Sequence, residues 1–198
     1  MPPSLHQVVL VRHGTTEWSL SGRHTGTTDI DLTPQGEADA AAVGEGLAGM
    51  SFGAVWSSPR RRTLRTAELA GLAGRAGPPP AVREDLAEWD YGSYEGLTSA
   101  QITERDPSWS IWTSGGPGGE SPAQVAARAD RVISDLLGEE GTVAVFSHGH
   151  FGRALAVRWV GLDVTWGRAF RLDAGAISIL GFERDQRAIT RWNQDPRN

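Results

Sequence analysis

The chain has 198 residues, with 19 basic and 24 acidic side chains and a formal net charge of −5. This length allows one domain with a buried core, and we expect a single domain over residues 1–198. The acidic balance argues against nucleic-acid binding, and a chain with no cysteine excludes disulfides, zinc ribbons and thiolate nucleophiles. All basic residues are arginine, which excludes Schiff-base lysine chemistry and the P-loop.

The sequence contains no apolar run that approaches the roughly 20 residues of a membrane span. Its first residues, Met1-Pro2-Pro3-Ser4, lack the basic and then apolar pattern of a signal peptide. We therefore expect a soluble, cytoplasmic protein that has no membrane partner.

In chain order, the first half of the sequence alternates strand and helix signals. Continuous apolar runs at residues 8–11 and 54–56 predict strands buried on both faces of a sheet. Two stretches that begin with a hydroxyl residue followed by proline predict helices over residues 33–48 and 58–72. The predicted N-cap residues are Thr33 and Ser58.

The second half continues the alternation. A capping box at Ser121 begins a predicted helix whose apolar stripe ends near Leu136. A third apolar run follows at residues 143–146, and residues 176–180 and 188–190 predict an edge hairpin. Together these elements predict an α/β fold: a three-layer α/β/α sandwich with a largely parallel central sheet.

Polar and charged residues follow each of the three predicted strands. Arg12-His13-Gly14 follows the first, residues 57–62 the second, and residues 147–150 the third. In open α/β sheets, ligands bind outside the carboxyl ends of the strands, so we expect these residues to meet at one edge. Fixed cations, glycines that permit close backbone approach, and imidazoles together predict an anion site.

The segment from Leu10 to Trp18 resembles the signature of the histidine phosphatase superfamily, which has the phosphoglycerate mutase-like fold. Five further stretches show the same resemblance, occur in the family's order and span most of the chain. They are residues 25–36, 57–68, 88–97, 119–121 and 147–149.

This resemblance implies that His13 is the nucleophile that becomes phosphohistidine. Arginines close to His13 would disfavour its protonation, which keeps the imidazole neutral and nucleophilic. They would also stabilise the charge that phosphoryl transfer spreads over the equatorial oxygens. The residues implied to hold those oxygens are Arg12, Arg62 and His148.

Glu88 matches the family's proton donor, with Glu84 and Asp85 nearby as rival acids. An alkoxide is a poor leaving group and needs such a donor, which can act only while it is protonated. We therefore expect the best activity below neutral pH. Other positions match residues that contact substrate or lie near it: Ser19, Thr25, Gly26, Tyr91 and His150.

Residues 91–120 are predicted to form a cap or loop insertion over the site, with the glycine-rich stretch 115–119 as a surface loop. Phosphoglycerate mutases carry extra basic residues after the acid, whereas residues 109–116 are uncharged here. Ser19 also replaces an asparagine that is frequent in the family and contacts phosphate. Fewer cations predict a weaker grip on a second phosphate, which favours water as the acceptor.

The resemblance is nearest to the acid phosphatase and sedoheptulose-bisphosphatase-like branches, through residues 88–96, 147–150 and 173–175. It implies a phosphomonoester hydrolase, without metal or cofactor, that acts on a small phosphorylated metabolite such as a sugar phosphate. The alternatives are a cofactor-dependent phosphoglycerate mutase and a non-catalytic module that binds a phospho-ligand. A homodimer is left open.

Overall fold

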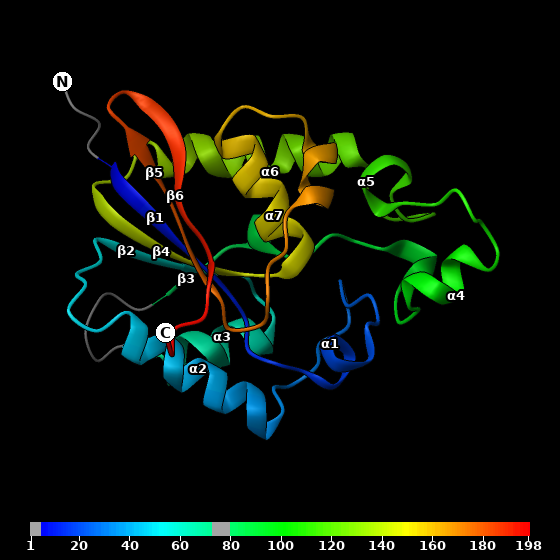
Figure 1. The fold of residues 1–198 in the computed structure, drawn as a ribbon, viewed down its shortest axis with the longest axis horizontal. Coiled ribbons are helices and arrows are strands. Elements are labelled where there is room, and N and C mark those ends of the chain that lie inside the picture. Colours follow the sequence, from blue (N-terminus) through cyan, green and yellow to red (C-terminus); the bar gives the residue numbers. More distant parts are fainter. Residues whose placement is uncertain (1–4, 73–79) are drawn as a thin grey trace.

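The computed structural model describes residues 5–72 and 80–198, which build one sheet with the strand order β3-β2-β4-β1-β5-β6 (Figure 1). The strands are β1 (Leu5–Arg12), β2 (Ala54–Ser57), β3 (Ala81–Val82), β4 (Gly141–Ser147), β5 (Ile177–Glu183) and β6 (Gln186–Gln194). The α-helices are α1 (Glu17–Ser21), α2 (Pro34–Gly46), α3 (Arg61–Leu69), α4 (Ser99–Thr103), α5 (Ile111–Ser114), α6 (Pro122–Leu136) and α7 (Gly149–Trp159). Shorter 3-10 turns are η1 (Glu84–Leu86), η2 (Gly92–Tyr94) and η3 (Val164–Ala169).

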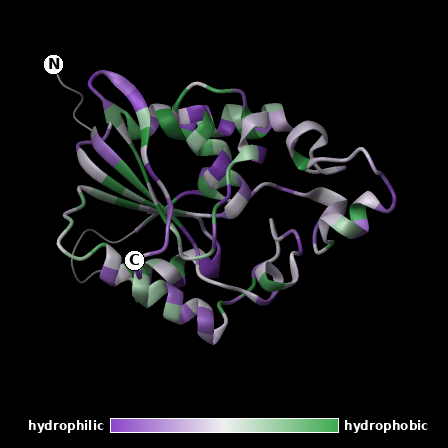
Figure 2. Cartoon of the chain, in the orientation of Figure 1, coloured by the Kyte–Doolittle hydropathy of each residue, from purple (hydrophilic) through white to green (hydrophobic). Residues whose placement is uncertain are grey.

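The sheet is mixed, as predicted. Strands β3, β2, β4 and β1 run parallel, while β5 is antiparallel to β1 and pairs with β6 in a hairpin at the edge. The hairpin turn requires a positive φ at Arg184, which is 54°. Figure 2 shows hydrophobic residues along the central strands and a hydrophilic hairpin tip.

Alternate side chains of β1 enter two separate cores, which explains why its apolar run is continuous. Val8 and Leu10 pack in the core that α6 and α7 cover, whereas Val9 and Val11 pack in the core that α2 and α3 cover. All four side chains are fully buried. The predicted three-layer α/β/α sandwich is therefore confirmed.

Two of the three predicted helix caps are correct. The side chains of Thr33 and Ser121 accept the N–H groups that begin α2 and α6. The cap predicted at Ser58 is wrong, because the N-cap of α3 is Arg60 and it has no side-chain cap hydrogen bond. The Ser58 hydroxyl lies instead 2.7 Å from His148 Nε2. The group predicted to cap the helix therefore forms a hydrogen bond with a residue of the candidate site.

Helices α4 and α5 lie beside the sandwich in Figure 1, within the segment 91–120. The glycine-rich stretch 115–119 in this segment packs tightly against earlier backbone. A Cβ at Gly116 would lie 2.1 Å from the carbonyl oxygen of Tyr91, and one at Gly119 would lie 2.2 Å from that of Asp90. Glycine is therefore needed at these positions for close approach.

Candidate active site

The carboxyl ends of β1, β2 and β4 lie side by side, and the residues that follow them form the candidate site. Arg12 pairs with Ser147 across β1 and β4, and Ser57 pairs with Phe146 across β2 and β4. The strands therefore end at a similar level. This register brings the rings of His13 and His148 together, with centroids 5.3 Å apart.

His13 is held as a neutral imidazole whose Nε2 has a free lone pair. Its Nδ1 lies 2.8 Å from the carbonyl oxygen of Gly14, and since a carbonyl only accepts, Nδ1 must donate the hydrogen. Burial, followed by the nearby cations Arg62 and Arg12, lowers the pKa of His13 well below its ordinary value. The neutral form of the ring is therefore favoured.

The backbone after His13 packs closely against the start of α2. A Cβ at Gly14 would lie 2.2 Å from the carbonyl oxygen of Gly36, and one at Gly36 would lie 2.0 Å from that of Thr15. The backbone N–H and the hydroxyl of Thr15 donate to Asp39 Oδ2 at 3.2 and 2.6 Å. These contacts fix the position of the backbone next to His13.

Two buried guanidinium groups and His148 lie around His13. Arg12 donates to the carbonyl oxygen of Leu172 at 2.5 Å, and Arg62 donates to two carbonyl oxygens of residues 25–28, both at 3.0 Å. Burial lowers the pKa of each arginine, but a guanidinium remains charged in proteins. Within the described residues, neither is ion-paired with a carboxylate.

Three buried side-chain atoms of this group have no hydrogen-bond partner: Arg12 Nε, Arg62 Nε and His148 Nδ1. They are the full set of such atoms in the part of the chain that the structure describes. Buried polar atoms are otherwise almost always paired, so these three unpaired atoms single out this region of the described chain.

Glu88 lies at the N-terminus of α7. Its carboxylate accepts hydrogen bonds from the backbone N–H groups of Trp89, His150 and Phe151, at 2.9, 3.0 and 2.7 Å. Of the three acids that the sequence offers, Glu88 lines the pocket, whereas Glu84 and Asp85 do not. The structure thus orients one carboxyl group towards the site.

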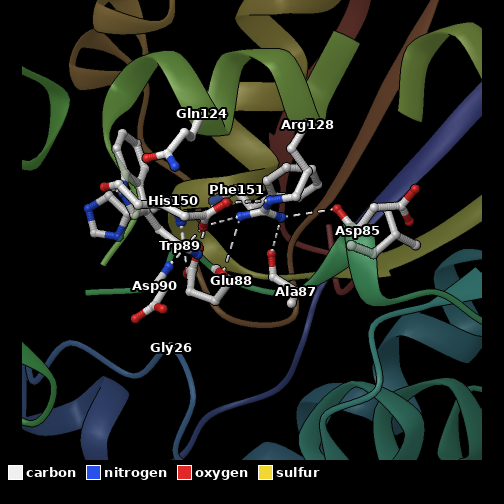
Figure 3. A network of polar contacts seen from close by, with 12 residues as sticks. Gly26, Asp85, Ala87, Glu88, Trp89, Asp90, Gln124, Arg128, His150 and Phe151 are labelled. Atoms are coloured by element: carbon white, nitrogen blue, oxygen red, sulfur yellow. Dashed lines mark hydrogen bonds and ion pairs between the residues drawn. The ribbon is translucent and has the colours of Figure 1, made fainter. Parts of the chain in front are cut away.

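Arg128 of α6 fixes the backbone that precedes this acid (Figure 3). It donates to both carboxylate oxygens of Glu120, at 2.8 and 2.7 Å, and to the carbonyl oxygens of Asp85 and Ala87, at 3.0 and 2.7 Å. Its guanidinium carbon lies 4.2 Å from the centre of the Phe151 ring. The acid is therefore held from α6 as well as from α7.

A cavity of about 390 Å³ opens in front of these groups. Seven of the ten candidate residues line it: Arg12, His13, Ser19, Thr25, Glu88, Tyr91 and His150. The three others do not: Arg62, His148 and Gly26. Arg62 and His148 are fully buried, so the orphaned nitrogens of these two residues lie in the wall rather than on the surface.

Three residues predicted to contact substrate, Ser19, Thr25 and Gly26, differ in the local contacts that already involve them. The hydroxyl of Ser19 is engaged in the cap of α1, where it exchanges hydrogen bonds with the backbone of Thr16 at 2.8 and 2.9 Å. The Thr25 hydroxyl donates to the carbonyl oxygen of Arg23 at 3.1 Å. A Cβ at Gly26 would lie 2.5 Å from the carbonyl oxygen of Trp89, which explains the glycine by packing.

Several residues that line the cavity were missed by sequence reasoning, among them His24 and Arg153. His24 directly precedes Thr25 and Gly26, which match the family. A histidine beside this matching segment was the signal that the sequence offered. Arg153 lies one turn into α7 after His148, and its guanidinium lies 4.8 Å from the Trp112 ring. It donates to the carbonyl oxygens of Gly149 and Phe170, at 3.2 and 3.0 Å.

The histidines of this region make the free protein sensitive to acid. Burial lowers the pKa of His13, His24, His148 and His150. Below pH of about 6.5 the unfolded chain binds protons that the folded chain does not. The free energy of unfolding should therefore fall as pH drops from about 6.5 towards the lowered folded values, by up to about 1.4 kcal/mol per pH unit for each group.

Thermal melts of the purified protein between pH 7.5 and 5 test this expectation. The melting temperature should fall towards pH 5, and 10 mM inorganic phosphate should reduce the fall because a bound anion stabilises protonated histidine. Chloride at equal ionic strength is the control. A melting temperature that is constant over this range without phosphate would contradict the buried neutral histidines.

The described part of the chain contains no group of three or more His, Cys, Asp or Glu side chains placed to hold a metal ion. No helix among the described residues is long and apolar enough to cross a membrane.

Comparisons with known proteins agree with this geometry. The family model of the histidine phosphatase superfamily (branch 1) matches residues 8–195. An acid phosphatase of Mycobacterium tuberculosis is 46% identical over 188 residues, which covers 93% of this chain and 90% of that protein. The sedoheptulose 1,7-bisphosphatase of Saccharomyces cerevisiae is 34% identical over 192 residues, covering 83% of this chain and 71% of that protein.

A solved structure of the product of open reading frame Rv3214 from Mycobacterium tuberculosis has the same fold. Its TM-score is 0.89 at 43% identity, covering 96% of this chain and 98% of that one. The fold and the family match define a phosphoryl-transfer enzyme of the phosphoglycerate mutase-like class. The chain belongs to the histidine phosphatase superfamily, and its named relatives favour a phosphatase over a mutase.

Proposed function

We propose that this phosphatase hydrolyses the monoester of a small phosphorylated metabolite, of the sugar-phosphate class, through a phosphohistidine on His13. One observation carries the proposal. The unpaired buried nitrogens of Arg12, Arg62 and His148 surround a neutral imidazole that has a free Nε2. Such nitrogens are matched to the equatorial oxygens of a phosphoryl group in transfer.

In the first step, His13 Nε2 attacks phosphorus while the bond between phosphorus and the leaving oxygen breaks. Glu88 gives its proton to that oxygen, so the leaving group departs as a neutral alcohol and Glu88 becomes a carboxylate. Arg12 and Arg62 stabilise the charge on the equatorial oxygens, since carbonyl partners leave both cations unneutralised.

In the second step, water attacks phosphorus and the bond to His13 Nε2 breaks. The Glu88 carboxylate takes the proton from the attacking water, which restores the acid, and inorganic phosphate leaves. The cationic charge needed in both steps comes from arginine, so we propose that no metal takes part. Dialysis against EDTA should then leave turnover unchanged.

The test that separates hydrolysis from mutase activity is incubation with 3-phosphoglycerate. We expect free phosphate to accumulate, and p-nitrophenyl phosphate to be hydrolysed as well. Conversion to 2-phosphoglycerate without release of phosphate would favour the mutase. No turnover on any phosphomonoester would favour a non-catalytic module that binds a phospho-ligand.

Replacement of Glu88 by glutamine should affect substrates according to their leaving groups. Glutamine cannot donate a proton as an acid does, so kcat with an alkyl phosphate should fall by about 10²- to 10⁴-fold. With p-nitrophenyl phosphate, whose leaving group needs no proton, the fall should be smaller than tenfold. Steady-state kinetics on both substrates measures the difference.

Glu84→Gln is the matched control, because Glu84 is exposed and lies outside the pocket. It should change neither rate by more than twofold. An equal loss of rate on both substrates in Glu88→Gln would mean that the residue positions the site rather than donates the proton.

A further inference from the structure

A group of aromatic residues and histidines forms one wall of the cavity beside the phosphoryl site. Its members on the cavity are His24, Tyr91 and His150. The ring centroids of His24 and His150 lie 5.8 Å apart with planes at 25°, so the two imidazoles are nearly parallel. The Tyr91 ring lies 4.7 Å from that of His24. The mechanism proposed above uses none of these side chains.

The tautomer of His24 is fixed by its surroundings. Its Nδ1 lies 2.8 Å from the carbonyl oxygen of Leu97, so Nδ1 carries the hydrogen and Nε2 can only accept. Burial lowers the pKa of His24, which keeps the ring neutral. Within the described residues its Nε2 has no hydrogen-bond partner, although the residue lines the cavity.

His150 offers a hydrogen-bond donor, which complements the acceptor on His24. The Tyr91 hydroxyl lies 2.8 Å from His150 Nδ1, and burial raises the pKa of Tyr91, so the phenol keeps its proton. When this phenol donates to Nδ1, the neutral His150 ring must carry its hydrogen on Nε2. The pair then presents one acceptor, on His24, and one donor, on His150.

A hydroxyl group is the ligand that matches one acceptor and one donor, because it can donate and accept at once. An anionic oxygen could accept from His150 Nε2 but would leave the lone pair of His24 Nε2 without a donor. An alkyl chain would leave both nitrogens unpaired. Both rings are neutral, so the wall selects by hydrogen bonding rather than by charge.

We propose that His24 and His150 form a subsite that recognises a hydroxyl group on the leaving-group part of the substrate. The enzyme is thereby specific for monoesters of polyols and sugars over those of simple alcohols. This inference rests on the proposed phosphomonoesterase activity and names the feature of the leaving group that the enzyme reads.

The test compares ribitol 5-phosphate with 1-pentyl phosphate, two primary alkyl monoesters with five-carbon chains. The wild-type enzyme should prefer ribitol 5-phosphate in kcat/KM by about 10- to 100-fold, since the pentyl chain leaves the buried polar groups unpaired. His24→Phe keeps a ring against Tyr91 but removes the acceptor, and should reduce this preference to less than threefold. His24→Gln supplies an amide oxygen as acceptor and should retain more of the preference.

His6→Phe is the matched control, because His6 is exposed on β1 and lies outside the cavity. It should leave the preference at the wild-type value. Equal rates for the two substrates in the wild-type enzyme would overturn the inference without any variant, as would an undiminished preference in folded His24→Phe. Failure to hydrolyse p-nitrophenyl phosphate would instead overturn the proposed function itself.

Discussion

Alanine in place of His13 should reduce the hydrolysis of every phosphomonoester by about 10⁴-fold or more, because the attacking atom itself is removed. No acid-labile phosphate should then be trapped on the protein when a radiolabelled substrate is quenched in base. Wild-type enzyme quenched in the same way should carry the label on His13. Single-turnover labelling followed by peptide mapping measures both outcomes.

Binding of the anion should survive this substitution. The guanidinium groups of Arg12 and Arg62 and the ring of His148 all remain in this variant, so inorganic phosphate should bind His13→Ala with an affinity within about tenfold of wild type, by calorimetry. His6→Ala is the control for loss of an imidazole and should keep full activity. Label found on another residue, or His13→Ala that retains more than a hundredth of the rate, would refute the assigned nucleophile.

The core of this site could be predicted because it is encoded next to strands. His13 and His148 each lie two residues after an apolar run of the kind that predicts a buried strand. Parallel strands end at one edge, so residues far apart in the chain meet there once the topology is known. The order of the predicted strands and the residues that follow them were enough to predict this meeting, and no side-chain geometry was needed.

The positions of His24 and Arg153 on the cavity could not be predicted in the same way. His24 comes from the loop after α1, and its ring direction depends on Leu97, which belongs to a distant segment. Arg153 is one of two arginines in α7, with Arg158, and only the packing of α7 shows that Arg153 lines the cavity. The Ser58 cap failed for a related reason, because a local capping pattern lost its hydroxyl to a tertiary partner, His148.

The arginines of the candidate site have different partners from those at the surface. Exposed or half-exposed ones such as Arg61 and Arg65 form ion pairs with carboxylates, whereas the buried Arg12 and Arg62 are held by carbonyl oxygens. Carbonyl oxygens orient a guanidinium without cancelling its charge. Burying a cation in this way lowers the stability of the fold. The same burial strengthens the electrostatic interaction of the cation with the phosphoryl group.

Replacement of Arg62 by methionine should therefore separate activity from folding. Loss of one buried cation that stabilises the transferring phosphoryl group should lower kcat/KM by about 10³-fold. Methionine fills similar space and removes a desolvated charge, but it leaves the carbonyl oxygens of Thr25 and Thr28 without their donor, so the free energy of unfolding at pH 7.5 should fall by no more than about 3 kcal/mol. Steady-state kinetics and urea unfolding measure the two quantities.

The pH profile of this variant gives a second and independent readout. Arg62 is the charged neighbour that most lowers the pKa of His13, so without it His13 should bind a proton at a higher pH. The acid limb of kcat/KM should then move towards neutral pH. Arg61→Met, on an exposed and ion-paired neighbour, should alter neither rate nor profile. An unshifted acid limb in Arg62→Met would show that burial alone keeps the nucleophile neutral.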